Sequence, residues 1–221
     1  MLYRIVKEIR TNCRPGFLLL VKKKYPFLIV LICNFVMIPL FILQLYRMSY
    51  NWNIAYADIK YCLEVLLPII ALLCPMILYM DCYHPDCREL IFIYKKNCIP
   101  DVIMLYILQM LQVMMIYGYL SFHISSIFMH FWHLAVVLLF YNCLYSILVS
   151  LFENVILSFF VVMLYHYFGI TSVYTANDII RYLFFITRDQ VSFKQYLYYT
   201  GCSMLFLKGC MIINDRKKYQ M

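Results

Sequence analysis

Residues 60–80 have the sequence KYCLEVLLPIIALLCPMILYM, and this apolar stretch is as long as the helix of about 20 residues that crosses a bilayer core. Five further apolar stretches occur at residues 25–46, 101–121, 128–150, 154–169 and 195–213. Hydrophobic residues make up 65% of the chain and charged residues 14%, whereas a soluble domain is about half apolar and a quarter charged. We predict an all-α polytopic membrane protein whose residues 1–221 form one unit with six transmembrane helices.

Positive charge is concentrated on alternate sides of the six stretches. Fourteen of the 19 Lys and Arg residues fall before the first stretch, between the second and third, or near the end of the chain. The other five are Arg47, Lys60, Arg181, Arg188 and Lys194. Because Lys and Arg are enriched on cytoplasmic flanks, we expect both termini in the cytoplasm and the chain in the plasma membrane of a bacterium. Charge placed in this way indicates anchoring to anionic headgroups and not nucleic-acid binding.

The N-terminal arm, residues 1–24, has the pattern of an amphipathic interfacial helix. Leu2, Ile5, Val6 and Ile9 recur at helical spacing, with basic residues on the other faces. Such an arm can act as an orientation signal or as an elbow that braces the first span, and the sequence leaves both open. The apolar run that follows has the length of a span and not that of a cleaved signal, so we expect it to remain in the mature protein.

The loop between the second and third spans carries signals for a short helix at residues 86–97. Asp86 can cap its start, Lys95 and Lys96 suit its C-terminal dipole, and Pro100 prevents easy continuation. An apolar face made by Leu90, Ile93 and Tyr94 suits docking onto a cytoplasmic partner.

Cysteines are frequent but do not form a metal or disulfide pattern. Cys82, His84 and Cys87 lack the paired Cys-x-x-Cys spacing of structural zinc sites. The ten cysteines leave the outer segments 47–59 and 170–194 empty, and those in spans or cytosolic loops behave as free thiols. We predict no metal site and no disulfide.

Several residues within the spans are unusual for a lipid environment. Glu64 has Lys60 one helical turn earlier, so it is either a paired interfacial carboxylate or a residue of a transport pathway. Pro39, Pro68 and Pro75 remove backbone donors and are predicted to kink their helices.

Four histidines, His123, His130, His133 and His166, fall towards the outer side of the predicted spans. We interpret them as part of an interfacial aromatic belt, together with the many tyrosines and phenylalanines. Ligation of haem or a metal is the alternative. The outer segment 170–194 predicts a capped amphipathic helix, either re-entrant or lying on the surface.

The second span ends in an acidic residue and is followed by the Arg88-Glu89-Leu90 run, a polar break and a further span that starts near Pro100. In this pattern the chain resembles ABC transporter permeases of the type-2 export family. The order of parts is similar over nearly the whole chain, from the amphipathic arm to the longer outer segment before the last span. The family usually places Gly and Thr or Ser near the Arg-Glu pair, where this chain has cysteines and aromatics.

The resemblance implies that residues 86–97 are a coupling helix seated on a cytoplasmic ABC ATPase. Its contacts would be Arg88, Glu89, Leu90, Ile93 and Tyr94. The resemblance further implies that ATP and Mg bind that partner, and that a second permease copy or a related permease completes the pathway.

The chain has no Gly-rich phosphate loop and no His-Glu-x-x-His or Gly-x-Ser-x-Gly motif, so we predict that it is not an enzyme and carries no cofactor. We expect a permease subunit that exports an amphipathic substrate such as a peptide, antibiotic or lipid. The alternatives are a six-span redox protein that uses the four histidines, and a membrane-embedded enzyme or assembly factor.

Overall fold

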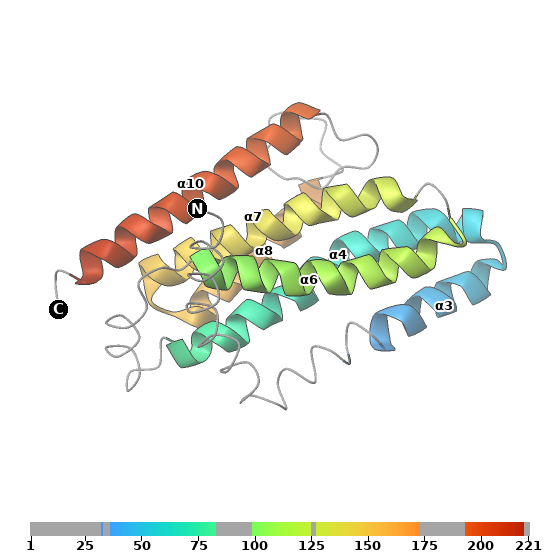
Figure 1. The fold of residues 1–221 in the computed structure, drawn as a ribbon. Coiled ribbons are helices and arrows are strands. Elements are labelled where there is room, and N and C mark those ends of the chain that lie inside the picture. Colours follow the sequence, from blue (N-terminus) through green and yellow to red (C-terminus); the bar gives the residue numbers. More distant parts are fainter. Residues whose placement is uncertain (1–31, 33–35, 83–98, 125–126, 173–192, 219–221) are drawn as a thin grey trace, which may run out of the picture.

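The computed structural model describes residue 32 and residues 36–82, 99–124, 127–172 and 193–218. These residues form six α-helices and contain no strand (Figure 1). The helices are α3 (Ile38–Ser49), α4 (Trp52–Cys82), α6 (Ile99–Ser121), α7 (Phe128–Phe152), α8 (Val155–Ser172) and α10 (Phe193–Lys218). The prediction of an all-α fold is therefore confirmed for the described part of the chain.

Four of these helices are long and apolar enough to cross a membrane. Their apolar segments are Ile54–Met80, Ile99–Ser121, His130–Phe152 and Phe193–Arg216. The fifth predicted span is the shorter helix α8, and the first is described only over its last part, α3. Helices of this length and composition fit a transmembrane protein.

The predicted outer loop at residues 47–59 is wrong in extent, because most of it belongs to α4. This helix has 31 residues and starts at Trp52. Polar residues in this stretch suggest a loop, but Ala55, Ile59 and Leu63 recur every four residues and are buried. The burial of that face continues the helix well beyond the apolar run.

Two tight turns are made by residues with left-handed backbone conformations. Tyr50, with φ 52°, ends α3, and its N–H donates to the carbonyl of Tyr46 at 2.8 Å. Glu153, with φ 54°, ends α7, and its N–H donates to the carbonyl of Val149 at 2.9 Å. Asn154 then caps α8, which explains how α7 and α8 are joined by so short a connection.

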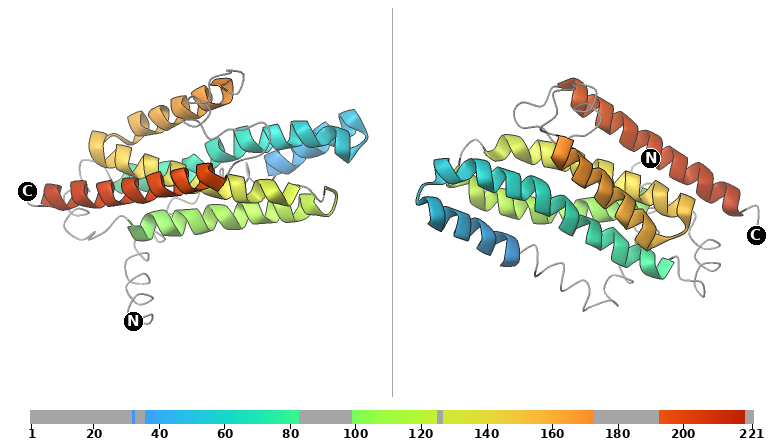
Figure 2. Two further views of the ribbon diagram at one scale, coloured as in Figure 1. Left: turned by 90° about the horizontal axis from the view of Figure 1, so that it is seen from above. Right: turned by 180° about the vertical axis from the view of Figure 1, so that it is seen from behind.

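Consecutive helices alternate in direction along the bundle (Figures 1 and 2). We call one end of the bundle the Trp52 end; there α3 finishes, α4 starts, α6 finishes and α7 starts. The opposite end, where α7 turns into α8, is called the Phe152 end. This arrangement agrees with the predicted order of spans.

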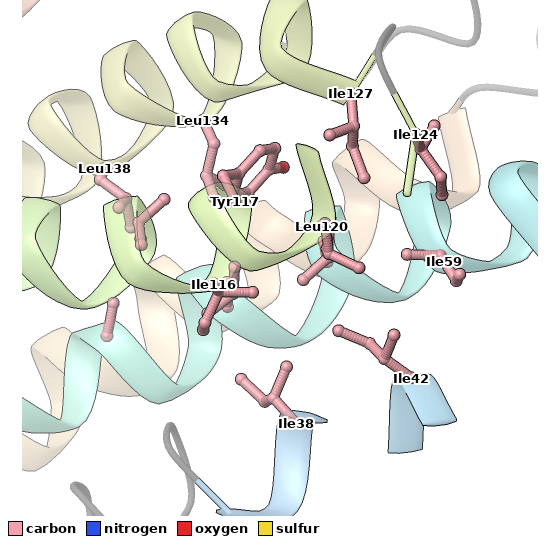
Figure 3. Close-up of a cluster of buried hydrophobic side chains, with 14 of the residues drawn as sticks. Ile38, Ile42, Ile59, Ile116, Tyr117, Leu120, Ile124, Ile127, Leu134 and Leu138 are labelled. Carbon is pink, nitrogen blue, oxygen red and sulfur yellow. The ribbon is translucent and has the colours of Figure 1, made fainter. Parts of the chain in front are cut away.

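Helix α7 is the central element, since it contacts α4, α6, α8 and α10. One core cluster joins it to α3, α4 and α6, with Tyr117, Leu134 and Leu138 among its members (Figure 3). A second cluster joins α7 to α4, α8 and α10 around Tyr145 and Tyr199. The remaining helices are thus held together largely through α7.

The outward faces of the helices are strongly apolar. Leu111 of α6, Phe160 of α8 and Leu205 of α10 are 53%, 60% and 68% exposed. Large exposed apolar faces are a liability in water but suit contact with lipid tails.

Two glycines of α10 provide a test of the packing between α7 and α10. A side chain at position 209 would meet Cδ1 of Ile147 at 2.9 Å, whereas one at position 201 meets nothing within 4 Å. Gly209→Leu should lower stability by about 1–3 kcal/mol through overpacking, measured by thermal unfolding in detergent. Gly201→Leu should not lower it. Ile147→Ala should restore part of the loss in Gly209→Leu, and equal effects of the two leucine variants would contradict this packing.

Candidate functional site

Twelve polar side chains of the described residues are buried inside the bundle. They are Glu64, Asp101, Gln109, Gln112, His133, Asn142, Ser146, Ser150, Ser158, His166, Gln195 and Ser203. Burying a polar group away from water is costly unless it is hydrogen-bonded, and polar groups within transmembrane helices are commonly functional. The hydrogen-bond partners of these side chains therefore indicate which of them have a structural role and which are candidates for a functional one.

The first arrangement of interest surrounds Pro75 of α4. Proline has no N–H, so Pro75 cannot donate to the carbonyl of Ala71, which would be its partner in a regular helix. The side chain of Gln109 on α6 supplies the missing donor, with its Nε2 2.8 Å from the Ala71 carbonyl oxygen. A side chain from a neighbouring helix thus replaces the backbone hydrogen bond that the proline removes.

Asn142 of α7 holds Gln109 in this position. The two side-chain amides pair, with Asn142 Nδ2 donating to Gln109 Oε1 and Gln109 Nε2 lying 3.4 Å from Asn142 Oδ1. Asn142 also donates to the carbonyl of Leu138 at 2.8 Å. Gln109 and Asn142 are 1% and 2% exposed, so the pair lies wholly inside the bundle.

A related arrangement lies close to Pro68, where a side chain bonds the carbonyl that follows the one left free by the proline. Pro68 leaves the carbonyl of Glu64 without its usual donor, and the neighbouring Val65 carbonyl lies 3.1 Å from Nε2 of His166 on α8. Because a carbonyl only accepts, His166 Nε2 carries the proton and Nδ1 accepts from the Tyr141 hydroxyl at 2.8 Å. His166 therefore joins α4, α7 and α8.

We call these two arrangements the proline clasps: Gln109 with Asn142 beside Pro75, and His166 with Tyr141 near Pro68. Tyr141 and Asn142 are consecutive residues of α7, and successive helix positions point about 100° apart. One residue therefore faces α8 while the next faces α6. The carbonyl freed by Pro75 thus receives a bond from Gln109, whereas His166 bonds the carbonyl next to the one that Pro68 frees.

A row of smaller polar residues continues along α7 towards the Phe152 end. Ser146 donates to the carbonyl of Asn142 at 2.8 Å and lies 3.1 Å from the hydroxyl of Tyr79 on α4. Ser150 Oγ lies 3.2 Å from Sγ of Cys210 on α10. Cys62, Cys74, Cys143, Cys202 and Cys210 are free thiols.

Glu64 lies on the inner side of α4, nearer the Trp52 end. It is 8% exposed, and Leu63 and Leu67 near it on α4 belong to the first core cluster. The predicted proximity to Lys60 is present. The burial places Glu64 inside the bundle and not on its lipid-facing surface.

The four histidines have different surroundings. His123 stacks on Trp52 at 4.5 Å, Trp52 stacks on Tyr46 at 4.2 Å, and His130 bonds to the Tyr56 hydroxyl. These aromatic contacts near the Trp52 end suit the predicted belt.

His133 and His166 do not belong to such a belt, because they are buried at 3% and 1% exposure. Both ring nitrogens of His166 are already used in hydrogen bonds. Within the described ranges, no three His, Cys, Asp or Glu side chains come together in a way that could hold a metal ion.

Several predicted features lie outside the described residues. These are the arm at residues 1–24, the coupling helix at 86–97 with Arg88, Glu89, Leu90, Ile93 and Tyr94, the residues His84 and Cys87, and most of the outer segment 170–194. Pro39 is placed in the first turn of α3, where a missing N–H costs little. Pro68 and Pro75 lie inside α4, which continues through both.

Gln109 and Asn142 were not singled out by the sequence. The available signal is that each is a polar residue in the middle of an apolar span. Comparison of the chain with protein-family models, curated proteins and solved structures finds no match.

The clasp at Pro75 can be tested by a double-mutant cycle. Gln109→Leu leaves both Asn142 and the Ala71 carbonyl without their partner and should destabilise the fold by about 1–3 kcal/mol in thermal unfolding. Asn142→Leu should also destabilise it, and the double variant should cost less than the sum, because it leaves fewer unpaired groups. Gln44→Leu, at an exposed position of α3, is the matched control. Small additive effects like that of the control would show that the pair is not a clasp.

Proposed function

We propose that this chain is the membrane-spanning permease subunit of an ATP-driven transporter of the type-2 ABC export class. In this proposal a separate cytoplasmic ATPase supplies ATP and Mg binding, and a second permease completes the pathway. The Phe152 end, the loop at 83–98 and both termini face the cytoplasm. The observation that carries the proposal is the construction of α4.

Helix α4 connects the two ends of the bundle and leads directly into the loop predicted to contact the ATPase. It is the longest described helix, at 31 residues, and contains both Pro68 and Pro75. A motion of the loop would therefore act first on the Cys82 end of this helix. The Pro75 region lies between that end and the buried Glu64.

The proline clasps supply a physical reason for α4 to bend there. Proline positions lack the backbone hydrogen bonds that stiffen a helix, and bends concentrate at them. At Pro75 the replacing bond comes from Gln109 on α6, and next to the carbonyl freed by Pro68 a bond comes from His166 on α8. Hinge bending would then exchange a few side-chain bonds and would not require the helix to unfold.

The sequence supports the assignment of ATP hydrolysis to a separate polypeptide. The chain has five glycines, at positions 16, 118, 169, 201 and 209, and no Gly-rich phosphate loop with Lys-Ser or Lys-Thr. A transporter built on it needs an ATPase from outside. The many apolar and aromatic side chains of the bundle suit an amphipathic substrate.

The proposal is tested by affinity purification from the native membrane in mild detergent. We expect a nucleotide-binding subunit to co-purify with the chain. Reversing the charges with Arg88→Glu and Glu89→Arg should reduce its recovery severalfold, since charged rim contacts guide such interfaces.

Arg47→Glu is the control, because Arg47 is an exposed residue in the last turn of α3, at the Trp52 end. Its recovery of the subunit should match that of the wild type. Absence of any nucleotide-binding subunit, or an equal loss with Arg47→Glu, would contradict the proposal.

A further inference from the structure

We propose that Tyr46, Trp52 and His123 form a pH-sensitive aromatic clamp at the Trp52 end of the bundle, which protonation of His123 strengthens. The inference depends on the stacking geometry of the three rings and needs no transport activity. Only the side of the membrane from which protons reach His123 rests on the proposed function, which places the Trp52 end outside the cytoplasm.

The three rings of the aromatic clamp are stacked, and Trp52 lies between the other two. The centroid of its ring is 4.2 Å from that of Tyr46, with an angle of 18° between the ring planes. It is 4.5 Å from that of His123, with an angle of 11°. Tyr46 belongs to the last turn of α3, Trp52 starts α4 and His123 follows the end of α6. The clamp therefore joins the ends of three helices (Figure 1).

The backbone and the core hold the rings of the clamp in position. The N–H of His123 donates to the carbonyl of Leu120 at 3.0 Å, and the N–H of Ile124 donates to the same carbonyl at 2.9 Å. Ile124 is buried in the first core cluster, and Trp52 packs against that cluster. The approach of His123 to Trp52 is thus fixed by neighbouring residues as well as by the stacking itself.

The ring of His123 is available to a proton. It lies beyond the apolar segment Ile99–Ser121 and is exposed. Among the described residues, none hydrogen-bonds its ring nitrogens or forms an ion pair with it. Histidine is the side chain that normally changes its charge between pH 5 and 8. His123 can therefore gain a proton without losing a bond, whereas His166 would have to give one up.

A positive charge on His123 strengthens its contact with Trp52. The face of an indole ring attracts cations more strongly than that of any other aromatic side chain. The two rings are nearly parallel, so the charged imidazole lies over this face. Tyr119 of α6 adds a T-shaped contact to His123, with ring centroids 5.4 Å apart. Protonation therefore favours the clamped arrangement over an open one.

His123 is the member of the clamp that changes its charge in this pH range. The other charged and titratable side chains on the helices around it at this end are Arg47, Tyr46 and Tyr50 at the end of α3, Tyr56, Asp58 and Lys60 on α4, Tyr117 and Tyr119 on α6, and His130 on α7. In the described part of the chain, none of them forms an ion pair with His123. His130 bonds to the Tyr56 hydroxyl instead.

The clamp acts on the helix that contains both internal prolines. Trp52 is the first residue of α4, and Pro68 and Pro75 lie further along the same helix. A stronger clamp holds this end of α4 against α3 and the end of α6. We therefore expect acid to keep the Trp52 end closed and neutral conditions to release it.

The contact between the two rings is tested by fluorescence of the full chain in detergent. The chain has two tryptophans, so Trp132→Phe, at an exposed position, leaves Trp52 as the only one. A charged imidazole that touches an indole quenches its emission by accepting an electron from the excited ring. We expect the emission of Trp52 to fall in one step between about pH 8 and 5. Adding His123→Gln to this variant should abolish the fall.

Two further variants serve as controls in the same Trp132→Phe background. His130→Gln removes the other histidine of this end that contacts an aromatic ring of α4, and it should keep the fall in emission. His123→Phe keeps a ring against Trp52 but cannot take up a proton, so it should abolish the fall. This variant decides the question if His123→Gln does not fold.

The strength of the clamp is tested by thermal unfolding at about pH 7.5 and 5.5. Charged His123 gains the indole as a partner only in the folded chain, so this stabilisation is present in acid and is lost as the pH rises and the imidazole loses its proton. On acidification the unfolding midpoint of the wild type should rise by about 1–4 °C relative to that of His123→Phe.

Three results would overturn the inference. They are an emission of Trp52 that does not respond to pH, a fall that persists in folded His123→Phe, and equal effects of pH on the unfolding midpoints of the wild type and His123→Phe. All these measurements use the chain without an ATPase, so such a result leaves the transporter proposal standing. A chain that shows the clamp but recovers no ATPase would contradict the transporter alone.

Discussion

The carbonyl of Ala71 has no backbone donor because Pro75 stands four residues later, and the amide of Gln109 takes the place of that donor from another helix. This hydrogen bond ties α6 to α4, and the pairing of Gln109 with Asn142 ties both to α7. His166 and Tyr141 make the corresponding link between α8, α4 and α7. The longest described helix therefore depends on side chains anchored to α7 for part of its backbone bonding.

These bonds suggest different roles for α7 and α4 within the bundle. Helix α7 contacts four other described helices, and its apolar segment His130–Phe152 is the most deeply buried of the four that could cross a membrane. Helix α10 packs on α7, but its apolar segment Phe193–Arg216 is the least buried of the four. We infer that α4, which contains two prolines, can bend while the central helix α7 keeps its place.

The sequence was sufficient for the coarse fold because length and apolar character locate helices that cross a membrane. It failed at the start of α4, where the burial of Ala55 and Ile59 extends a helix through polar residues. Pro68 and Pro75 were found, but their partners were not, because no pattern along one chain tells which helix will face a freed carbonyl. The same limit explains why His166 was assigned to an interfacial aromatic belt. In the structure it joins α8 to α7 and α4 through two hydrogen bonds.

We infer that α4 is the element of the bundle that bends and α7 the one that stays fixed. Hydrogen–deuterium exchange of the full-length chain, followed by mass spectrometry of peptides, tests it most directly because exchange reports local opening. We predict that amides of α4 at residues 66–76 exchange faster than those of α7 at residues 134–150, although both segments lie in the middle of the bundle. Equal protection of the two segments would contradict it.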